Sequence, residues 1–171
     1  SPGTCGVLNV TREAAGTESK TWTYTFVEAV NDFVLAYPNG VREDRSERLK
    51  SDDGATMVIR KESRDAVGAV FGKKESHYVK NNYKYLRQRE IRDPGGLNLT
   101  TSYSYHSGGA TDGLEKLRIS EDGSWTRCEY DDLRRKTAEI RPWLDSPTNA
   151  PDSQCAVTRY GYGLFAAGDF L

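Results

Sequence analysis

Residues 123–142, Gly123 to Pro142, read GSWTRCEYDDLRRKTAEIRP and decide the fold of this chain. The segment predicts a turn, a strand that ends at Tyr130-Asp131, a second turn and a strand that ends at Pro142. Two strands joined by a short polar turn form an antiparallel hairpin. Much of the chain repeats this plan with other residues, so the segment predicts a series of hairpins.

The composition favours a thin sheet with a solvent-exposed face over a thick core. The chain has 171 residues, of which 36% are hydrophobic, and its mean hydropathy is −0.72. A sheet with one wet face needs fewer apolar residues than a multilayer core. The 24 basic residues nearly balance the 25 acidic ones, which argues against nucleic-acid binding over the whole surface but leaves a local basic patch open.

The sequence also limits membrane, zinc and disulfide chemistry. No apolar run reaches the length of about 18 residues that a membrane span needs, so we expect no membrane insertion. The first residues lack the basic and apolar regions of a signal peptide, so any such peptide has been removed. Cys5, Cys128 and Cys155 form no C-x-x-C motif, which makes a zinc site improbable. They form either one disulfide and a free thiol or three thiols.

The first fifty residues predict a leading segment and three strands. Residues 1–17 are predicted as a linker or a leading strand, and residues 18–171 as one β domain. Thr21–Phe26 alternates threonine with aromatic residues, so we expect the three aromatics to share one face and to be more buried than the threonines. Asn39-Gly40 predicts a two-residue turn that pairs Phe33–Tyr37 with Val41–Arg45.

The remaining strands complete an all-β prediction. For residues 62–70 a short helix is the alternative, and the glycines at its end favour a strand. The fold class is therefore all-β, with consecutive antiparallel hairpins forming a curved sheet. Further strands are expected at 56–60, 83–91, 97–105, 114–119 and 155–162, with a truncated continuation at 164–171.

A degenerate repeat runs through the second half of the chain. Three strands end in spaced tyrosines, at Thr101–Tyr105, Thr126–Tyr130 and Val157–Tyr162. The intervals from Tyr105 to Tyr130 and on to Tyr162 are 25 and 32 residues. A period in this range is typical of repeat architectures, in which each hairpin buries its face against its neighbours.

These motifs resemble those of the Rhs/YD-repeat family over about residues 80–165. Residues 130–137, YDDLRRKT, resemble the family's Y-D-x-x-G-R-x-T repeat, with Arg134 in the glycine position. Residues 91–97, IRDPGGL, followed by TTSYSY at 100–105, are similar to its D-P-x-G turn and the next strand. The sequence departs from the pattern in having a single true Tyr-Asp pair, Tyr130-Asp131.

The resemblance implies a shell or solenoid segment. In that family, strings of hairpins coil into a hollow β-shell that can enclose a toxin domain, and teneurin-like adhesion proteins use the same shell. The chain is then a structural module, scaffold or wall, of a secreted or cell-surface protein and not an enzyme. Its expected partners are neighbouring repeats, other copies of the chain, or an enclosed toxin domain.

No catalytic, cofactor-binding or metal-ligating residue is assigned. His77 and His106 lie far apart and outside ligand motifs. Adjacent aspartates in turns bond their own backbone more often than they bind calcium. We therefore predict turn roles for the candidate carboxylates Asp52, Asp53, Asp131 and Asp132.

Three surface interpretations remain open from the sequence. Asn9 and Asn98 fit the N-glycosylation acceptor pattern. Exposed tyrosines and threonines with Trp125 could form a sugar-binding face, although aromatics at strand alternation more often form cross-strand packing pairs. A β-sandwich that binds carbohydrate or protein through an aromatic face is the alternative function. The basic run Arg134–Lys136 is interpreted as a solvated strand edge that resists the addition of further strands.

Overall fold

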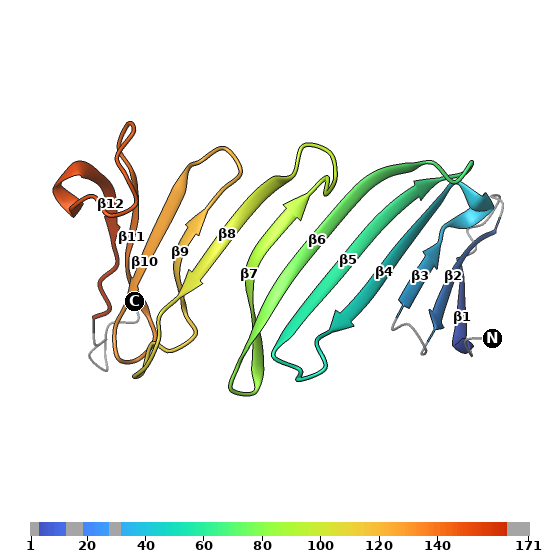
Figure 1. Ribbon diagram of the computed structural model, residues 1–171, viewed down its shortest axis with the longest axis horizontal. Coiled ribbons are helices and arrows are strands. Elements are labelled where there is room, and N and C mark those ends of the chain that lie inside the picture. The colour runs from blue at the N-terminus through green and yellow to red at the C-terminus, as the bar shows by residue number, and fades with distance from the viewer. Residues whose placement is uncertain (1–3, 13–18, 28–31, 164–171) are drawn as a thin grey trace, which may run out of the picture. The chain divides into compact units, whose positions relative to one another are not determined.

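The computed structural model describes residues 4–12, 19–27 and 32–163, which form an almost entirely β structure (Figure 1). The twelve strands follow one another in chain order within one sheet, which confirms the all-β class and the consecutive antiparallel hairpins. The described strands form this one sheet and not the two sheets of a β-sandwich. The strands are β1 (Thr4–Arg12), β2 (Lys20–Val27), β3 (Asp32–Ala36), β4 (Arg42–Lys50), β5 (Thr56–Asp65), β6 (Val70–Asn81), β7 (Lys84–Arg92), β8 (Leu99–Tyr105), β9 (Glu115–Ile119), β10 (Trp125–Tyr130), β11 (Lys136–Pro142) and β12 (Cys155–Arg159).

The chain divides into two compact units, residues 1–101 and 102–171. The first unit holds β1 to β7, the second holds β9 to β12, and β8 begins just before the boundary. Residues 4–12 form a leading strand that pairs with β2 inside the first unit. Among the described residues, no helix has the length and apolar character needed to span a bilayer. The continuation predicted at 164–171 lies outside the described residues.

Bulges interrupt the ladders of both units. Register shifts occur between Ser63 and Arg64 in β5 and between His77 and Tyr78 in β6 of the first unit. In the second unit they occur between Ser104 and Tyr105 in β8 and between Glu129 and Tyr130 in β10. Because a bulge bends and twists the strand that carries it, the expected curvature has a local cause in each unit.

The hairpin of β3 and β4 keeps the predicted register, but its turn is wider than predicted. Ala36 lies opposite Glu43, which is the register that Asn39-Gly40 predicts. The ladder nevertheless closes at Tyr37, whose N–H donates to the carbonyl of Arg42 at 2.9 Å, and Pro38–Gly40 forms a 3-10 turn. The prediction of a two-residue turn is wrong because Pro38 has no N–H to complete the narrow pair.

The prediction for β2 is correct about which side chains share a face and wrong about how deeply they are buried. Pairing sets Tyr24 opposite Leu8 and Leu35, and Thr23 opposite Asn9, so the two sets project from different faces. Phe26 is 40% exposed, and Thr23 and Tyr24 are both half-buried. The expected burial contrast is absent because the described part of the first unit places no second layer on either face.

The strand predicted for residues 62–70 is correct only as far as Asp65, because a turn follows and leads into β6, a strand that the sequence did not predict. β5 continues to Asp65, and the chain turns there before β6 begins at Val70. Gly68, with φ 83°, lies in this turn, and the Asp65 carboxylate accepts the N–H groups of Val67 and Ala69. The Asp-to-Gly segment therefore makes a tight reversal between strands.

The second unit contains the hydrophobic core found among the described residues. Trp125, Ala138 and Ile140 are buried, and Ala138 and Ile140 have 0% exposure. Trp125 lies opposite Ile119, and Ile140 lies opposite Val157, so the cluster occupies one face of β9 to β12. The interpretation of Trp125 as part of an exposed sugar-binding face is wrong, because this indole is 5% exposed.

Candidate functional site

The loop of residues 143–154 covers the core face of β10 to β12 and is held there by hydrogen bonds. The Trp125 indole N–H donates to the Ser146 carbonyl at 2.8 Å. Ala150 contributes a buried methyl group, with 4% exposure. The Ser146 hydroxyl lies 2.6 Å from the carbonyls of both Trp143 and Gln154, which joins the two ends of the loop. The loop acts as the second layer that a lone sheet lacks.

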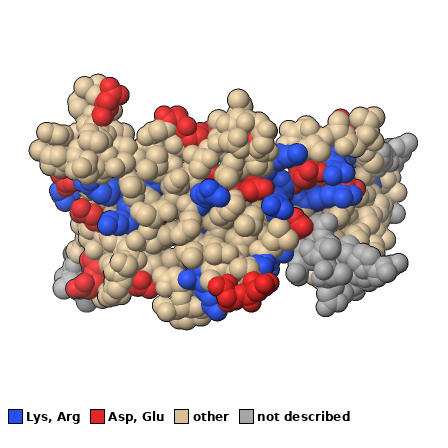
Figure 2. Space-filling view, in the orientation of Figure 1, with Lys and Arg blue, Asp and Glu red and all other residues tan. Residues whose placement is uncertain are grey.

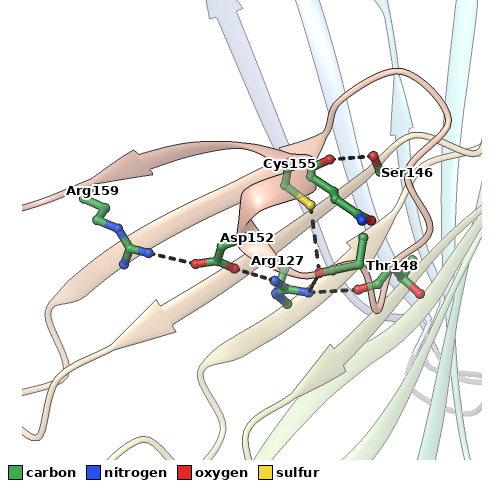
Figure 3. A network of polar contacts seen from close by, with 8 residues as sticks. Arg127, Ser146, Thr148, Asp152, Cys155 and Arg159 are labelled. Atoms are coloured by element: carbon green, nitrogen blue, oxygen red, sulfur yellow. Dashed lines mark hydrogen bonds and ion pairs between the residues drawn. The ribbon is translucent and has the colours of Figure 1, made fainter.

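Arg127 is the centre of the polar network under this loop (Figure 3). Its Nη1 donates to the carbonyls of Thr148 at 3.0 Å and Ala150 at 3.3 Å. Its Nη2 forms an ion pair with Asp152 Oδ1 at 2.9 Å, and Asp152 Oδ2 accepts from Arg159 at 2.8 Å. A guanidinium has five N–H donors in a fixed plane, so one side chain can satisfy several loop acceptors. Arg127 therefore ties the loop to β10.

The Tyr130-Asp131 turn is organised by the Asp131 carboxylate. Asp131 Oδ1 accepts the N–H groups of Leu133 at 3.0 Å and Arg135 at 2.9 Å, and Oδ2 pairs with the Arg135 side chain at 2.7 Å. Arg134 follows in the left-handed region with φ 65°, a conformation that glycine adopts readily. Its guanidinium donates to the carbonyls of Ala110 and Asp112, which hold the side chain in place.

Substitution of Arg134 separates backbone strain from side-chain bonding. Arg134→Ala keeps a Cβ at positive φ and loses the bonds to Ala110 and Asp112. Arg134→Gly loses the same bonds but relieves the strain, so we expect it to be about 1 kcal/mol more stable than Arg134→Ala. Urea unfolding of both variants measures this difference, and equal stabilities would contradict the assigned backbone strain.

Two of the four candidate carboxylates, Asp53 and Asp131, have the predicted turn role, whereas Asp52 and Asp132 accept no hydrogen bond from a described residue. Asp53 accepts from the Ser51 hydroxyl at 2.6 Å and from the Ala55 N–H at 2.9 Å. Asp122 accepts from the Ser124 N–H and hydroxyl. Backbone and side-chain hydrogen bonds from Arg135, together with its charge, lower the pKa of Asp131 below its ordinary value. Such bonds to the ionised form are present only in the folded chain.

A lowered carboxyl pKa makes stability depend on pH in a defined direction. The stabilisation by Asp131 is complete above the ordinary carboxyl pKa and is lost as the pH falls through the lower folded pKa. We expect Asp131→Asn to be less stable than the parent chain at neutral pH, with a gap that narrows in acid. Urea midpoints across the acid range test this. Asp132→Asn is the control, because the Asp132 carboxylate bonds to no described residue, and a gap that persists in acid would refute the assignment.

The D-P-G-G turn predicted at 93–96 is present. Asp93 has φ 52° and its Oδ2 accepts the Leu97 N–H at 2.8 Å. A Cβ on Gly96 would displace the Asp93 carboxylate from its place in this turn. The Asn98 side chain accepts from the Gly95 N–H and donates to the Gly96 carbonyl. Asn98 of the glycosylation pattern is thus an element of the turn.

The structure does not bring the two histidines together. His77 contacts the Glu75 carboxylate at 3.2 Å in β6 of the first unit. In the second unit, His106 contacts the Cys128 carbonyl at 3.0 Å and the edge of the Tyr130 ring. Cys128 and Cys155 are free thiols, and the side chain of Cys5 lies outside the described residues.

The contacts of the basic run contradict one surface interpretation, and those of Asn9 leave its glycosylation a prediction. The run Arg134–Lys136 is not a strand edge: β11 pairs with both β10 and β12. Arg135 stacks on the Tyr162 ring at 4.5 Å, and Lys136 pairs with Glu139 at 3.0 Å. Asn9, the first residue of the other glycosylation pattern, accepts from the Thr23 hydroxyl at 2.9 Å.

The charges of β4 to β6 are largely neutralised by each other. Arg60 of β5 bridges Glu47 of β4 and Glu75 of β6, at 3.6 and 3.0 Å. Within β4, Arg45 pairs with Glu43, so side chains of opposite charge lie side by side along the strand as well. Basic and acidic side chains are also interspersed on the visible face of the first unit (Figure 2). Such exposed pairs contribute little stability each.

The described residues contain no group of three or more His, Cys, Asp or Glu side chains that could hold a metal ion. The features found instead are structural: the loop tied to β10, the aspartate-organised turns and the paired charges of the first unit. Comparison of the chain with protein-family models, curated proteins and solved structures finds no match.

Proposed function

We propose that the chain is a structural β-repeat module of Rhs/YD-repeat type, a wall or scaffold segment of a secreted or cell-surface protein. One observation carries the proposal: the strands run in chain order as one antiparallel sheet. Among the described residues of the first unit, the buried positions are Met57 and Ser76. A sheet with so little enclosed apolar surface suits a wall better than a self-contained domain.

The geometry of the Tyr-Asp turn adds support. In the resembled repeat, glycine occupies the position of Arg134, and Arg134 has the positive φ that glycine favours. Asp131 caps the turn through its carboxylate, which explains why the motif has an aspartate at this position. In this proposal the partners are neighbouring repeats, other copies of the chain, or a toxin domain enclosed by the shell.

Association in solution tests the proposal. Directly after β12, the Tyr160 N–H donates to the carbonyl of Thr137 in β11, so the neighbouring Arg159 N–H points to the opposite edge. We expect the mass of the chain to rise with concentration, and amide exchange at Arg159 to slow with it, while exchange at Tyr160 stays constant. A monomer at all concentrations, with the Arg159 amide already protected, would overturn the wall assignment and favour a self-contained binding module.

A further inference from the structure

A row of seven residues crosses the first unit at right angles to its strands. Antiparallel pairing sets each of them opposite the next on consecutive strands, so their side chains project from one face. With strands about 4.8 Å apart, the row is about 29 Å long. We call it the aromatic–basic row: Gly6, Phe26, Phe33, Ser46, Lys61, Lys74 and Arg92.

The basic end of the row is unfavourable for the sheet itself. Lys61, Lys74 and Arg92 lie directly opposite one another on β5, β6 and β7, and like charges in such pairs destabilise a sheet. Glu90 pairs with Lys74 at 2.8 Å and also with Arg87, so one carboxylate serves two cations. Lys61 is exposed and forms no ion pair with a described residue.

On the opposite face of the same strands, cations alternate with carboxylates from one strand to the next. There Arg60 lies between two glutamates, and Arg64 pairs with Glu62. The two faces therefore differ in how their charges are balanced, although the chain as a whole is near neutral. Local departures from the rules of sheet stability occur mainly at functional sites.

The aromatic end of the row lies in a hollow. Phe26, Phe33, Ser46 and Arg48 line a space of about 370 Å³ on β2, β3 and β4. Phe26 and Phe33 are 40% and 38% exposed, so their rings are accessible. Arg48 lies two residues after Ser46 in β4, hence on the same face, and forms no ion pair with a described residue.

These groups match one kind of molecule. The C–H face of a sugar ring packs on a phenyl ring, a hydroxyl such as that of Ser46 bonds to sugar hydroxyls, and a guanidinium binds a carboxylate. A chain of such rings that continues from the hollow brings further carboxylates past Lys61, Lys74 and Arg92. We propose that the aromatic–basic row binds an acidic polysaccharide whose sugar rings carry carboxylates.

A single-stranded nucleic acid fits the row less well. Its bases stack on aromatic side chains spaced along the path of the backbone. In the row both aromatic residues lie at one end, and its members from Lys61 to Arg92 carry no ring. Bases along that stretch would have no ring to stack on, whereas the carboxylates of a sugar chain need only the cations.

Binding of a labelled oligogalacturonate to the full chain, followed by fluorescence anisotropy, tests the proposal. We expect saturable binding that weakens between about 50 and 200 mM salt, as counterion release requires. A neutral oligosaccharide of equal length should not bind measurably. Lys61→Gln with Arg92→Gln should weaken binding about tenfold, and Phe33→Ala should weaken it with little change in salt dependence.

The matched control is Lys73→Gln with Lys84→Gln. It removes the same charge from the opposite face of β6 and β7. Lys73 is next to Lys74 in β6 and Lys84 is next to Tyr85 in β7, so both point away from the face of the row. We expect binding to change by less than about twofold in this variant. Equal losses in both double variants, tighter binding of an oligothymidylate of the same charge, or no binding of the oligogalacturonate would each overturn the proposal.

Discussion

Replacement of Ile140 by alanine is expected to lower the free energy of unfolding of the second unit by about 3 kcal/mol. Ile140 has 0% exposure and lies in β11 between Arg127 of β10 and Val157 of β12. Removal of its side chain leaves a cavity, because the two flanking strands are held in register by backbone bonds and cannot close on it.

Denaturation followed by tryptophan fluorescence provides the measurement in a background that carries Trp22→Phe and Trp143→Phe, because the signal then comes from Trp125, which belongs to the same cluster. Leu133→Ala is the control: Leu133 is 70% exposed, and we expect its truncation to change stability by less than about 0.5 kcal/mol. If Ile140→Ala had an effect as small as the control, the cluster around Trp125 would not be the core of this unit.

Many of the turns could be predicted from the sequence because turn chemistry is local, whereas the 12-residue strand β6 was not predicted. Asp122-Gly123 and Asp53-Gly54 supply a carboxylate that accepts nearby N–H groups and a glycine at positive φ. These requirements fall on particular residue types at fixed spacing, so they are visible in one sequence. Pro38 shows the limit, because its missing N–H widened a turn whose register was otherwise correct.

The burial of the side chains could not be predicted from the same turn and alternation signals. A period of two assigns side chains to faces, but whether a face is covered depends on residues distant in the sequence. Trp125 is buried because residues 143–154 fold over it, and Phe26 is exposed although it lies in an equally apolar alternation. The aromatic–basic row was likewise invisible, since its members lie on different strands and meet only once the register is known.

The loop over the core was missed for a chemical reason. Its anchors are the backbone carbonyls of Ser146, Thr148 and Ala150, and every residue carries a carbonyl. The donors, Trp125 and Arg127, alternate along β10 with the spacing expected for one face, which was a usable signal for a shared role. An arginine on the same face as a buried tryptophan needs several acceptors, and a proline-containing polar loop supplies them.

Arg127→Ala should therefore reduce stability by about 2–3 kcal/mol, because it leaves two loop carbonyls and the Asp152 carboxylate without their shared donor. Arg159→Ala is the matched control, since Arg159 pairs with the same Asp152 but is 65% exposed, and we expect it to change stability by less than about 1 kcal/mol.

Hydrogen exchange should show that the loop over the core is the part that loosens. In Arg127→Ala the amide of Ala150, bonded to the Pro147 carbonyl, should exchange faster, while the Tyr160 amide in the β11–β12 ladder keeps its protection longer. Equal destabilisation by the two substitutions would mean that Asp152, and not Arg127, holds the loop on the sheet.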